Sequence, residues 1–147
     1  MFGATHSGAG KTTITLGVMY ALMRKGLKVQ PFKVGPDYID TGWHKTATGN
    51  PSFNLDAFML PEETLKYLFS VHANQSDINI IEGVMGLFDG YHNNPDFCSS
   101  ASLAKMLHCP IFLVVDGKSV STSIAATVMG FQKFNSGISI AGVLINR

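Results

Sequence analysis

Charged side chains are scarce in this sequence. Asp, Glu, Lys and Arg make up 14% of its 147 residues, against about a quarter in an ordinary soluble domain. Eleven basic and ten acidic residues leave a formal net charge of +1, and no run of Lys or Arg is present. No electrostatic argument therefore favours nucleic acid or an anionic membrane as a partner. A surface so poor in charge indicates that another domain or subunit covers part of it.

Long apolar runs and cysteine pairs are also missing. No stretch reaches the 18 apolar residues that a membrane span needs, and the N-terminus lacks the regions of a signal peptide. The two cysteines, Cys98 and Cys109, form neither a Cys-x-x-Cys motif nor a zinc-binding spacing. We therefore expect a cytoplasmic protein whose cysteines are reduced.

The pattern of apolar residues is that of alternating helices and strands. Hydrophobic residues make up 46% of the chain, enough for the core of one domain. The periodicity predicts helices over 10–25, 61–72, 99–108 and 123–134, and strands over 29–34, 78–82, 111–116 and 138–145. This alternation predicts an α/β fold with a parallel sheet and helices on both faces. Ligands of such folds bind beyond the carboxyl ends of the strands.

A glycine-rich phosphate-binding loop is the strongest single motif. Residues 5–12 read Thr-His-Ser-Gly-Ala-Gly-Lys-Thr and match the P-loop pattern G-x-x-x-x-G-K-[ST] except at Thr5. Lys11 is expected to reach the β- and γ-phosphates, and the Thr12 hydroxyl is expected to hold Mg²⁺. We predict that ATP with Mg²⁺ binds through Ser7, Gly8, Ala9, Gly10, Lys11, Thr12 and Thr13.

The loop excludes one subclass, and its position indicates a truncated strand. Partitioning and septum-placement ATPases carry a second lysine five positions before the main one, where this chain has His6. A loop that works across a dimer is therefore not supported, although the sequence leaves a homodimer open. Only Met1 and Phe2 precede the loop, and the sequence stops at Arg147 directly after a predicted strand. We therefore expect one P-loop NTPase-type domain over 1–147, incomplete at both ends, with a truncated first strand.

Half of the acidic residues lie at or just after predicted strand ends. Glu82 ends an apolar strand as a Walker B acid would, with Glu in place of Asp. Asp116 ends another strand, but Gly117 behind it makes a turn or cap role nearly as plausible. Carboxylates at this edge of a sheet are suited to Mg²⁺ and substrate. The five acids are Asp37, Asp40, Glu82, Asp89 and Asp116.

Three strings carry a resemblance to a known family. They are the phosphate loop, Phe-Lys-Val-Gly-Pro-Asp-Tyr-Ile-Asp at 32–40, and Glu-Gly-Val-Met-Gly-Leu-Phe-Asp-Gly at 82–90. With the segment 48–56, they resemble the a,c-diamide synthases of corrin biosynthesis over essentially the whole chain. Cobyric acid synthase and dethiobiotin synthetase share the wider superfamily but lack the second string. One mild departure is Ala4-Thr5, where the family more often has Gly-Thr.

The resemblance implies an ATP-dependent ligase that amidates the a and c carboxylates of cobyrinic acid through a phosphorylated carboxylate. Glutamine or ammonia would supply the nitrogen, and a C-terminal glutamine amidotransferase domain, absent from this sequence, would process the glutamine. The resemblance also implies roles for single residues. Thr12, Asp37 and Glu82 would hold the metal; Lys11, Asp40 and Asp89 would act in catalysis; Asn146 would contact the adenine.

Several alternatives stay open at the level of sequence. The substrate could be hydrogenobyrinic acid or nickel-sirohydrochlorin instead, the chain could be a nucleotide-switch ATPase that binds a protein partner, or it could be an inert fragment. Lys33 and Lys45 could hold a polycarboxylate or be solvated surface charges. Cys98 is expected to be structural. Of the five histidines only His6 lies in a site by position, and His44, His72, His92 and His108 are expected on the surface or in the core.

Overall fold

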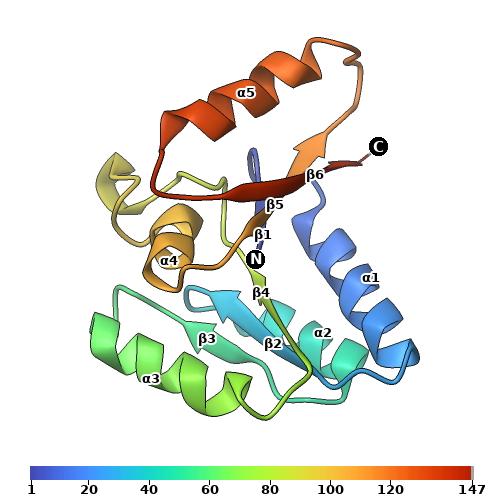
Figure 1. Ribbon diagram of the computed structural model, residues 1–147, viewed down its shortest axis with the longest axis vertical. Helices are drawn as coiled ribbons and strands as arrows, with labels where there is room; N and C mark the ends of the chain where they lie inside the picture. The colour runs from blue at the N-terminus through green and yellow to red at the C-terminus, as the bar shows by residue number, and fades with distance from the viewer. Residues whose placement is uncertain (147) are drawn as a thin grey trace.

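A computed structural model describes residues 1–146 as a three-layer α/β unit (Figure 1). Within these residues six strands form one parallel sheet in the order β3-β2-β4-β1-β5-β6. The strands are β1 (Phe2–Ala4), β2 (Val29–Val34), β3 (Phe53–Leu55), β4 (Ile78–Glu82), β5 (Ile111–Asp116) and β6 (Ile140–Asn146). The α-helices are α1 (Lys11–Arg24), α2 (Ile39–Thr48), α3 (Glu62–Ala73), α4 (Ser100–Met106) and α5 (Ile124–Phe134), and a short 3₁₀ helix covers Tyr91–Asn93. The predicted fold class is confirmed.

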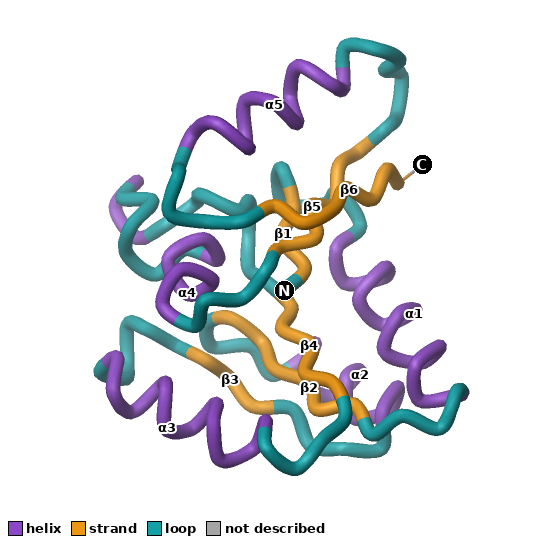
Figure 2. The backbone as a smooth tube through the Cα atoms, viewed as in Figure 1, coloured by secondary structure: helices purple, strands orange, loops and turns teal. Residues whose placement is uncertain are grey.

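Both faces of the sheet are buried, because apolar side chains alternate along the central strands. On β5, Leu113 joins the cluster under α3, α4 and α5, whereas Val114 joins the cluster under α1. On β4, Ile81 and Ile80 divide in the same way. α1 lies on the opposite side of the sheet from α3 and α4, and α5 lies beside β6 at one end (Figures 1 and 2). Burial on both faces accounts for the near-continuous apolar runs of these strands.

The strand that feeds the phosphate loop is present but short, as expected. β1 has three residues and lies between β4 and β5 in the middle of the sheet. It pairs with β5 from Phe2 to Ala4, but only Phe2 lies opposite a residue of β4, which is Glu82. This register places Glu82 beside the strand that enters the phosphate loop.

Three elements, α2, β3 and the 3₁₀ helix at Tyr91–Asn93, were not predicted. α2 begins where Asp37 Oδ1 accepts the backbone N–H groups of Ile39 and Asp40, at 2.9 and 2.8 Å, and ends at Gly49 in the left-handed conformation with φ 74°. Its residues 39–48 include three threonines and a glycine, which have low helix propensity. Three-residue β3 is too short for a period to be visible. The predicted elements otherwise differ by one or two residues at their ends, as helix and strand termini usually do.

The described helices have lengths typical of a globular domain. None of them, within residues 1–146, is both long and apolar enough to cross a membrane.

Candidate active site

The phosphate loop forms one wall of a pocket of about 460 Å³ at the carboxyl edge of the sheet. Gly8 and Gly10 have φ values of 86° and 92°, a left-handed conformation that favours glycine. The residues that line this phosphate pocket are Ser7, Gly8, Gly10, Lys11, Thr12, Thr13, Lys33, Asp37, Asp40, Val84 and Met85. The loop and the strings at 32–40 and 82–90 therefore meet at one pocket, at the edge of the sheet where ligands are expected to bind.

Asn146, at the end of β6, contacts the backbone of the phosphate loop. Its Nδ2 donates a hydrogen bond of 2.9 Å to the carbonyl oxygen of Ala9, which is fully buried. A Cβ added to Gly10 would lie 2.1 Å from Asn146 Nδ2, so this position tolerates only glycine without displacing that side chain. The predicted contact between Asn146 and adenine stays a prediction.

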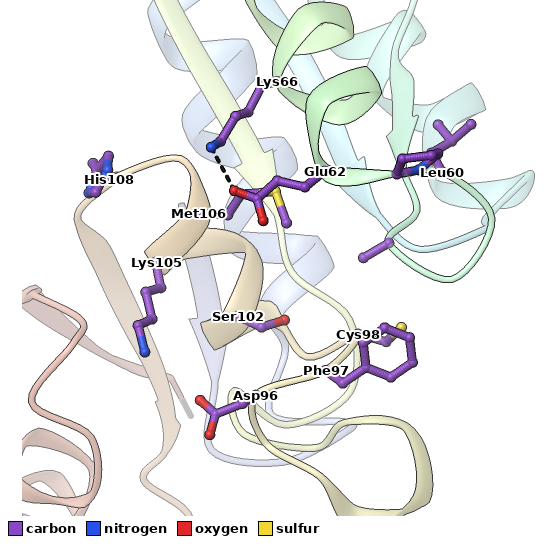
Figure 3. Close-up of a pocket in the computed structure, with 12 residues that line it drawn as sticks. Leu60, Glu62, Lys66, Asp96, Phe97, Cys98, Ser102, Lys105, Met106 and His108 are labelled. Atoms are coloured by element: carbon purple, nitrogen blue, oxygen red, sulfur yellow. Dashed lines mark ion pairs between the residues drawn. The ribbon is translucent and has the colours of Figure 1, made fainter.

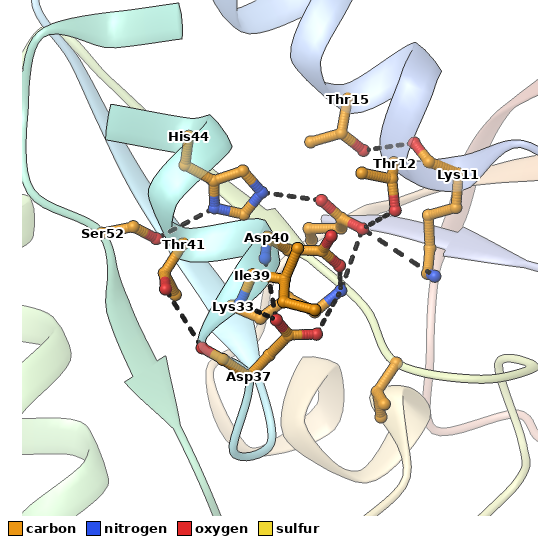
Figure 4. A network of polar contacts seen from close by, with 12 residues as sticks. Lys11, Thr12, Thr15, Lys33, Asp37, Ile39, Asp40, Thr41, His44 and Ser52 are labelled. Atoms are coloured by element: carbon orange, nitrogen blue, oxygen red, sulfur yellow. Dashed lines mark hydrogen bonds and ion pairs between the residues drawn. The ribbon is translucent and has the colours of Figure 1, made fainter. Parts of the chain in front are cut away.

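Glu82 is the centre of a polar network. Its partners Lys11, Thr12, Lys33 and His44 point toward one another in Figure 4. Glu82 is fully buried, and its Oε1 accepts hydrogen bonds from Thr12 Oγ1 at 2.6 Å and Lys33 Nζ at 2.9 Å. Its Oε2 lies 2.7 Å from His44 Nε2, and Lys11 Nζ lies 4.0 Å from Oε1. Burial alone would raise the pKa of Glu82, but the bonds from His44 and Thr12 and the charge of Lys33 outweigh it and lower the pKa to about 2. The buried carboxylate is therefore ionised at neutral pH.

Lys33 is a buried cation of the site and not a solvated surface charge. Its Nζ lies 2.6 Å from Asp40 Oδ2, 2.9 Å from Glu82 Oε1 and 3.9 Å from Asp37 Oδ2. Burial would lower its pKa, but the neighbouring carboxylates of Glu82 and Asp40 raise the pKa above its ordinary value. Lys45, by contrast, is exposed. Of the two lysines left open by the sequence, only Lys33 belongs to the network.

The pKa of Lys11 shifts in the opposite direction to that of Lys33. Burial and the positive charge of Lys33 lower its pKa, although nearby carboxylates oppose the shift. A partly desolvated ammonium group beside a glycine-rich loop is suited to bind an anion.

The two acids of the string at 32–40, Asp37 and Asp40, have different hydrogen-bond partners. Asp37 uses Oδ1 to cap α2 and keeps Oδ2 toward Lys33. The carbonyl oxygen of Asp37 accepts a 3.1 Å hydrogen bond from Asn54 Nδ2, so the family-like segment at 48–56 supports this wall. Asp40 points its carboxylate at Lys33.

The third string does not place Asp89 on the pocket wall. Asp89 is exposed, and its Oδ2 accepts the backbone N–H of Gly86 at 2.8 Å. Its role near the substrate stays a prediction. Asp116 Oδ1 accepts the N–H of Lys118 at 2.9 Å, which agrees with the turn role that Gly117 indicated.

His44 is the site residue that sequence reasoning missed. It is fully buried and bonded to Glu82, with Nδ1 2.9 Å from Ser52 Oγ. A detectable signal was its spacing: His44 follows Asp40 by four residues, so both side chains leave the same face of α2. His6, which lies in the loop by position, is exposed and contacts the hydroxyl of Thr5 at 3.0 Å.

The donor atoms of this site fit Mg²⁺. The described residues contain no cluster of three or more His, Cys, Asp or Glu side chains arranged to hold a metal. They do offer hard oxygen ligands on the pocket side, namely the Thr12 hydroxyl beside Glu82 Oε1 and the Oδ2 of Asp37, which lies 3.9 Å from Lys33 Nζ. Mg²⁺ usually takes one or two protein ligands and completes its shell with water and phosphate oxygens, so this set is sufficient.

A second hollow, of about 630 Å³, lies between α3, α4 and the loop at 96–98 (Figure 3). It shares no residue with the phosphate pocket, and Lys66 forms an exposed 2.6 Å ion pair with Glu62 at its rim. Cys98 lines it, and burial together with the charge of Asp56 raises the pKa of this thiol. Burial also raises the pKa of Cys109. Neither thiol is activated as a nucleophile would be, in agreement with a structural role.

The chain is similar in sequence to several curated proteins named cobyrinate a,c-diamide synthase. Cobyrinate a,c-diamide synthase of Salmonella typhimurium is 57% identical over 147 residues, which cover all of this chain and 32% of that protein. Proteins of the same name from Listeria monocytogenes serotype 4b and Picrophilus torridus are 54% and 47% identical and are covered to 33% each. The chain therefore spans about a third of the length of these curated relatives.

A solved structure shares the fold alone. It is a DUF1611 family protein from Anabaena variabilis, with a TM-score of 0.59, 13% identity, and coverage of 99% of this chain and 44% of that one. A family model described as the CobQ/CobB/MinD/ParA nucleotide binding domain matches residues 1–147. Because this match spans the whole chain, the chain belongs to the CobQ/CobB/MinD/ParA nucleotide-binding domain family.

Proposed function

We propose that this chain is the ATP-binding part of a ligase that converts the a and c carboxylates of cobyrinic acid into amides. The observation that carries the proposal is the convergence of Lys11, Thr12 and Lys33 on buried Glu82, beside one pocket lined by a phosphate loop. Asp40 completes the network through its ion pair with Lys33. The names of the relatives support the same reaction.

ATP binding follows from the loop. In this proposal the β- and γ-phosphates lie over Ser7, Gly8 and Gly10, near the positive end of α1. Lys11 binds a phosphate oxygen, since its partly buried ammonium group lies on the pocket wall. Thr12, Asp37 and Glu82 would hold Mg²⁺, which would neutralise phosphate charge.

Activation of the carboxylate explains why ATP is needed. Ammonia does not displace oxygen from a carboxylate in water, because that oxygen is a poor leaving group. A carboxylate oxygen of the substrate attacks the γ-phosphorus, ADP leaves, and ammonia then attacks the carbonyl carbon. The carbon–oxygen bond breaks, inorganic phosphate leaves, and the nitrogen loses a proton. Lys11 and Lys33 stabilise the negative charge that gathers during the transfer.

The rim of the pocket suits a large substrate with an apolar body. Tyr38 and Ile39, which follow the pocket residue Asp37, are 91% and 74% exposed, and Trp43 is 57% exposed one helical turn later. Met85 lines the pocket and is 53% exposed. Exposed apolar side chains next to a polar site are typical of ligand-binding surfaces. They fit a macrocycle that presents its carboxylates to the phosphate pocket.

The nitrogen supply lies outside the residues described here. Burial raises the pKa of both Cys98 and Cys109, whereas glutamine hydrolysis needs an activated nucleophile. A glutamine amidotransferase domain in the longer protein would meet this need, in keeping with relatives three times as long as the chain.

The experiment is amide formation on cobyrinic acid, followed by mass spectrometry, with ATP, Mg²⁺ and either glutamine or ammonium salt. Parallel reactions use hydrogenobyrinic acid and nickel-sirohydrochlorin, the two related tetrapyrroles. ATP-dependent diamide formation on cobyrinic acid supports the proposal. Faster turnover of another tetrapyrrole would replace the substrate, and ATP binding without amidation of any of them would favour a nucleotide switch.

A further inference from the structure

His44, on α2, contacts both the nucleotide site and the segment that leads into β3. Its ring is fully buried, with Nε2 2.7 Å from Glu82 Oε2 and Nδ1 2.9 Å from Ser52 Oγ. Ser52 lies just before β3, so the imidazole bridges the end of that connection and the end of β4. Both ring nitrogens are engaged, and the ring cannot turn without breaking one bond.

The bond to His44 determines which way the Glu82 carboxylate faces. The last torsion of a glutamate side chain has a broad, roughly two-fold profile, so burial alone does not select one orientation. His44 holds Oε2, and the remaining oxygen, Oε1, then lies toward Thr12 and Lys33. Without the imidazole, Oε2 would lose its hydrogen bond to His44 inside the core, and the carboxylate would be held through Oε1 alone.

The position of His44 on α2 directs its side chain toward Glu82. Asp40 and His44 are one turn apart, and they contact Lys33 and Glu82 respectively. The next residue on that face, Thr48, donates its hydroxyl to the carbonyl oxygen of His44 at 2.8 Å. Thr48 is also buried but has no bond to Glu82, which makes it a matched control for the packing of the same helix.

We propose that His44 is a positioning residue that orients Glu82 toward Thr12 and thereby sets the affinity of the site for the metal ion that accompanies ATP. This inference rests on the proposed function of the phosphate pocket. Hydrogen bonds from residues behind a metal ligand typically change metal affinity by about 10- to 100-fold. A purely structural His44 would lower stability and leave the metal dependence of nucleotide binding unchanged.

The test compares ATP binding with and without Mg²⁺ in the protein at its natural length. The variants are His44→Leu, which removes the bond; His44→Gln, which keeps an N–H donor; Ser52→Ala, which frees the ring; and the control Thr48→Ala. We expect His44→Leu to raise the half-saturating Mg²⁺ concentration about 10- to 100-fold. Affinity for ATP in EDTA should change less than about twofold, because the loop contacts are untouched. His44→Gln should recover part of the loss, Ser52→Ala should show a smaller loss, and Thr48→Ala should bind Mg²⁺ as the unmodified protein does.

The outcomes separate the two proposals. If the unmodified protein binds ATP no better with Mg²⁺ than with EDTA, the metal assignment of the proposed function is wrong. If it shows a clear Mg²⁺ dependence that His44→Leu and Ser52→Ala both retain, the positioning role is wrong while the proposed function stands. An equal loss in Thr48→Ala would also overturn it, since the effect would then come from the packing of α2. Should His44→Leu not fold, His44→Gln and Ser52→Ala decide the question by the same readout.

Discussion

Replacing Glu82 by glutamine should weaken the fold in a way that depends on pH. Glu82→Gln removes the negative charge that Lys33 and Lys11 face at 2.9 and 4.0 Å, while Lys33 stays buried. Removing one member of a buried ion pair costs about 3–5 kcal/mol. Asp40 remains beside Lys33, so we expect a loss at the lower end of this range at pH 7.

The pH dependence follows from the lowered pKa of Glu82. In the folded protein this pKa is about 2, against an ordinary 4.5. A carboxyl group with a depressed pKa in the folded state stabilises it above the unfolded pKa and loses this effect as the pH falls through the folded pKa. The difference corresponds to about 3 kcal/mol at neutral pH, of which about 2 kcal/mol is lost between pH 7 and pH 3.

The assay is urea unfolding of the unmodified protein and Glu82→Gln at pH 7 and pH 3. All other acids are shared by the two proteins, so the difference between them isolates Glu82. We expect the difference in unfolding free energy to shrink by about 2 kcal/mol from pH 7 to pH 3. A difference below about 1 kcal/mol at pH 7, within the range of surface substitutions, or one that does not change with pH, would refute the reasoning.

Three further predictions concern the loop and the thiols. Lys11→Ala should weaken ATP binding about 10- to 100-fold in calorimetric titration, since a hydrogen bond to a charged group contributes about 1.5–3 kcal/mol; unchanged affinity would contradict the phosphate-loop assignment. Gly10→Ala should abolish ATP binding, because φ is 92° and the new Cβ meets Asn146. Its control Gly17→Ala, in α1 with nothing within 4 Å, should keep binding and raise stability by about 0.5–1 kcal/mol. Cys98→Ser should leave amidation with glutamine and with ammonia unchanged, and loss of only the glutamine reaction would assign Cys98 a catalytic role.

The parts of the fold with strong local signals could be predicted from sequence. β4 and β5 are short, largely apolar segments, and the phosphate loop has a nearly complete motif. β2 is buried along its whole length, although it also carries Gln30 and Lys33. The convergence of the three strings followed from one rule, namely that carboxyl ends of parallel strands share an edge.

The remaining parts depend on contacts that no local pattern encodes. α2 forms despite weak propensity because Asp37 caps it and because Asp40 and His44 find partners on β2 and β4. His44 was expected on the surface or in the core; it is buried in the core, but it also contacts Glu82 in the site. Asp89 belongs to a site-like string, but the turn at Gly86 directs its carboxylate to the backbone.

The most direct test of the proposed reaction follows the fate of one oxygen atom. Cobyrinic acid labelled with oxygen-18 in its carboxylates is incubated with ATP, Mg²⁺, ammonium salt and the protein at its natural length, and the inorganic phosphate is analysed by mass spectrometry. If the carboxylate is phosphorylated before amide formation, one labelled oxygen appears in phosphate for each amide formed, and Lys11→Ala forms neither product. Diamide formation with unlabelled phosphate, or phosphate release that does not require cobyrinic acid, would contradict the account.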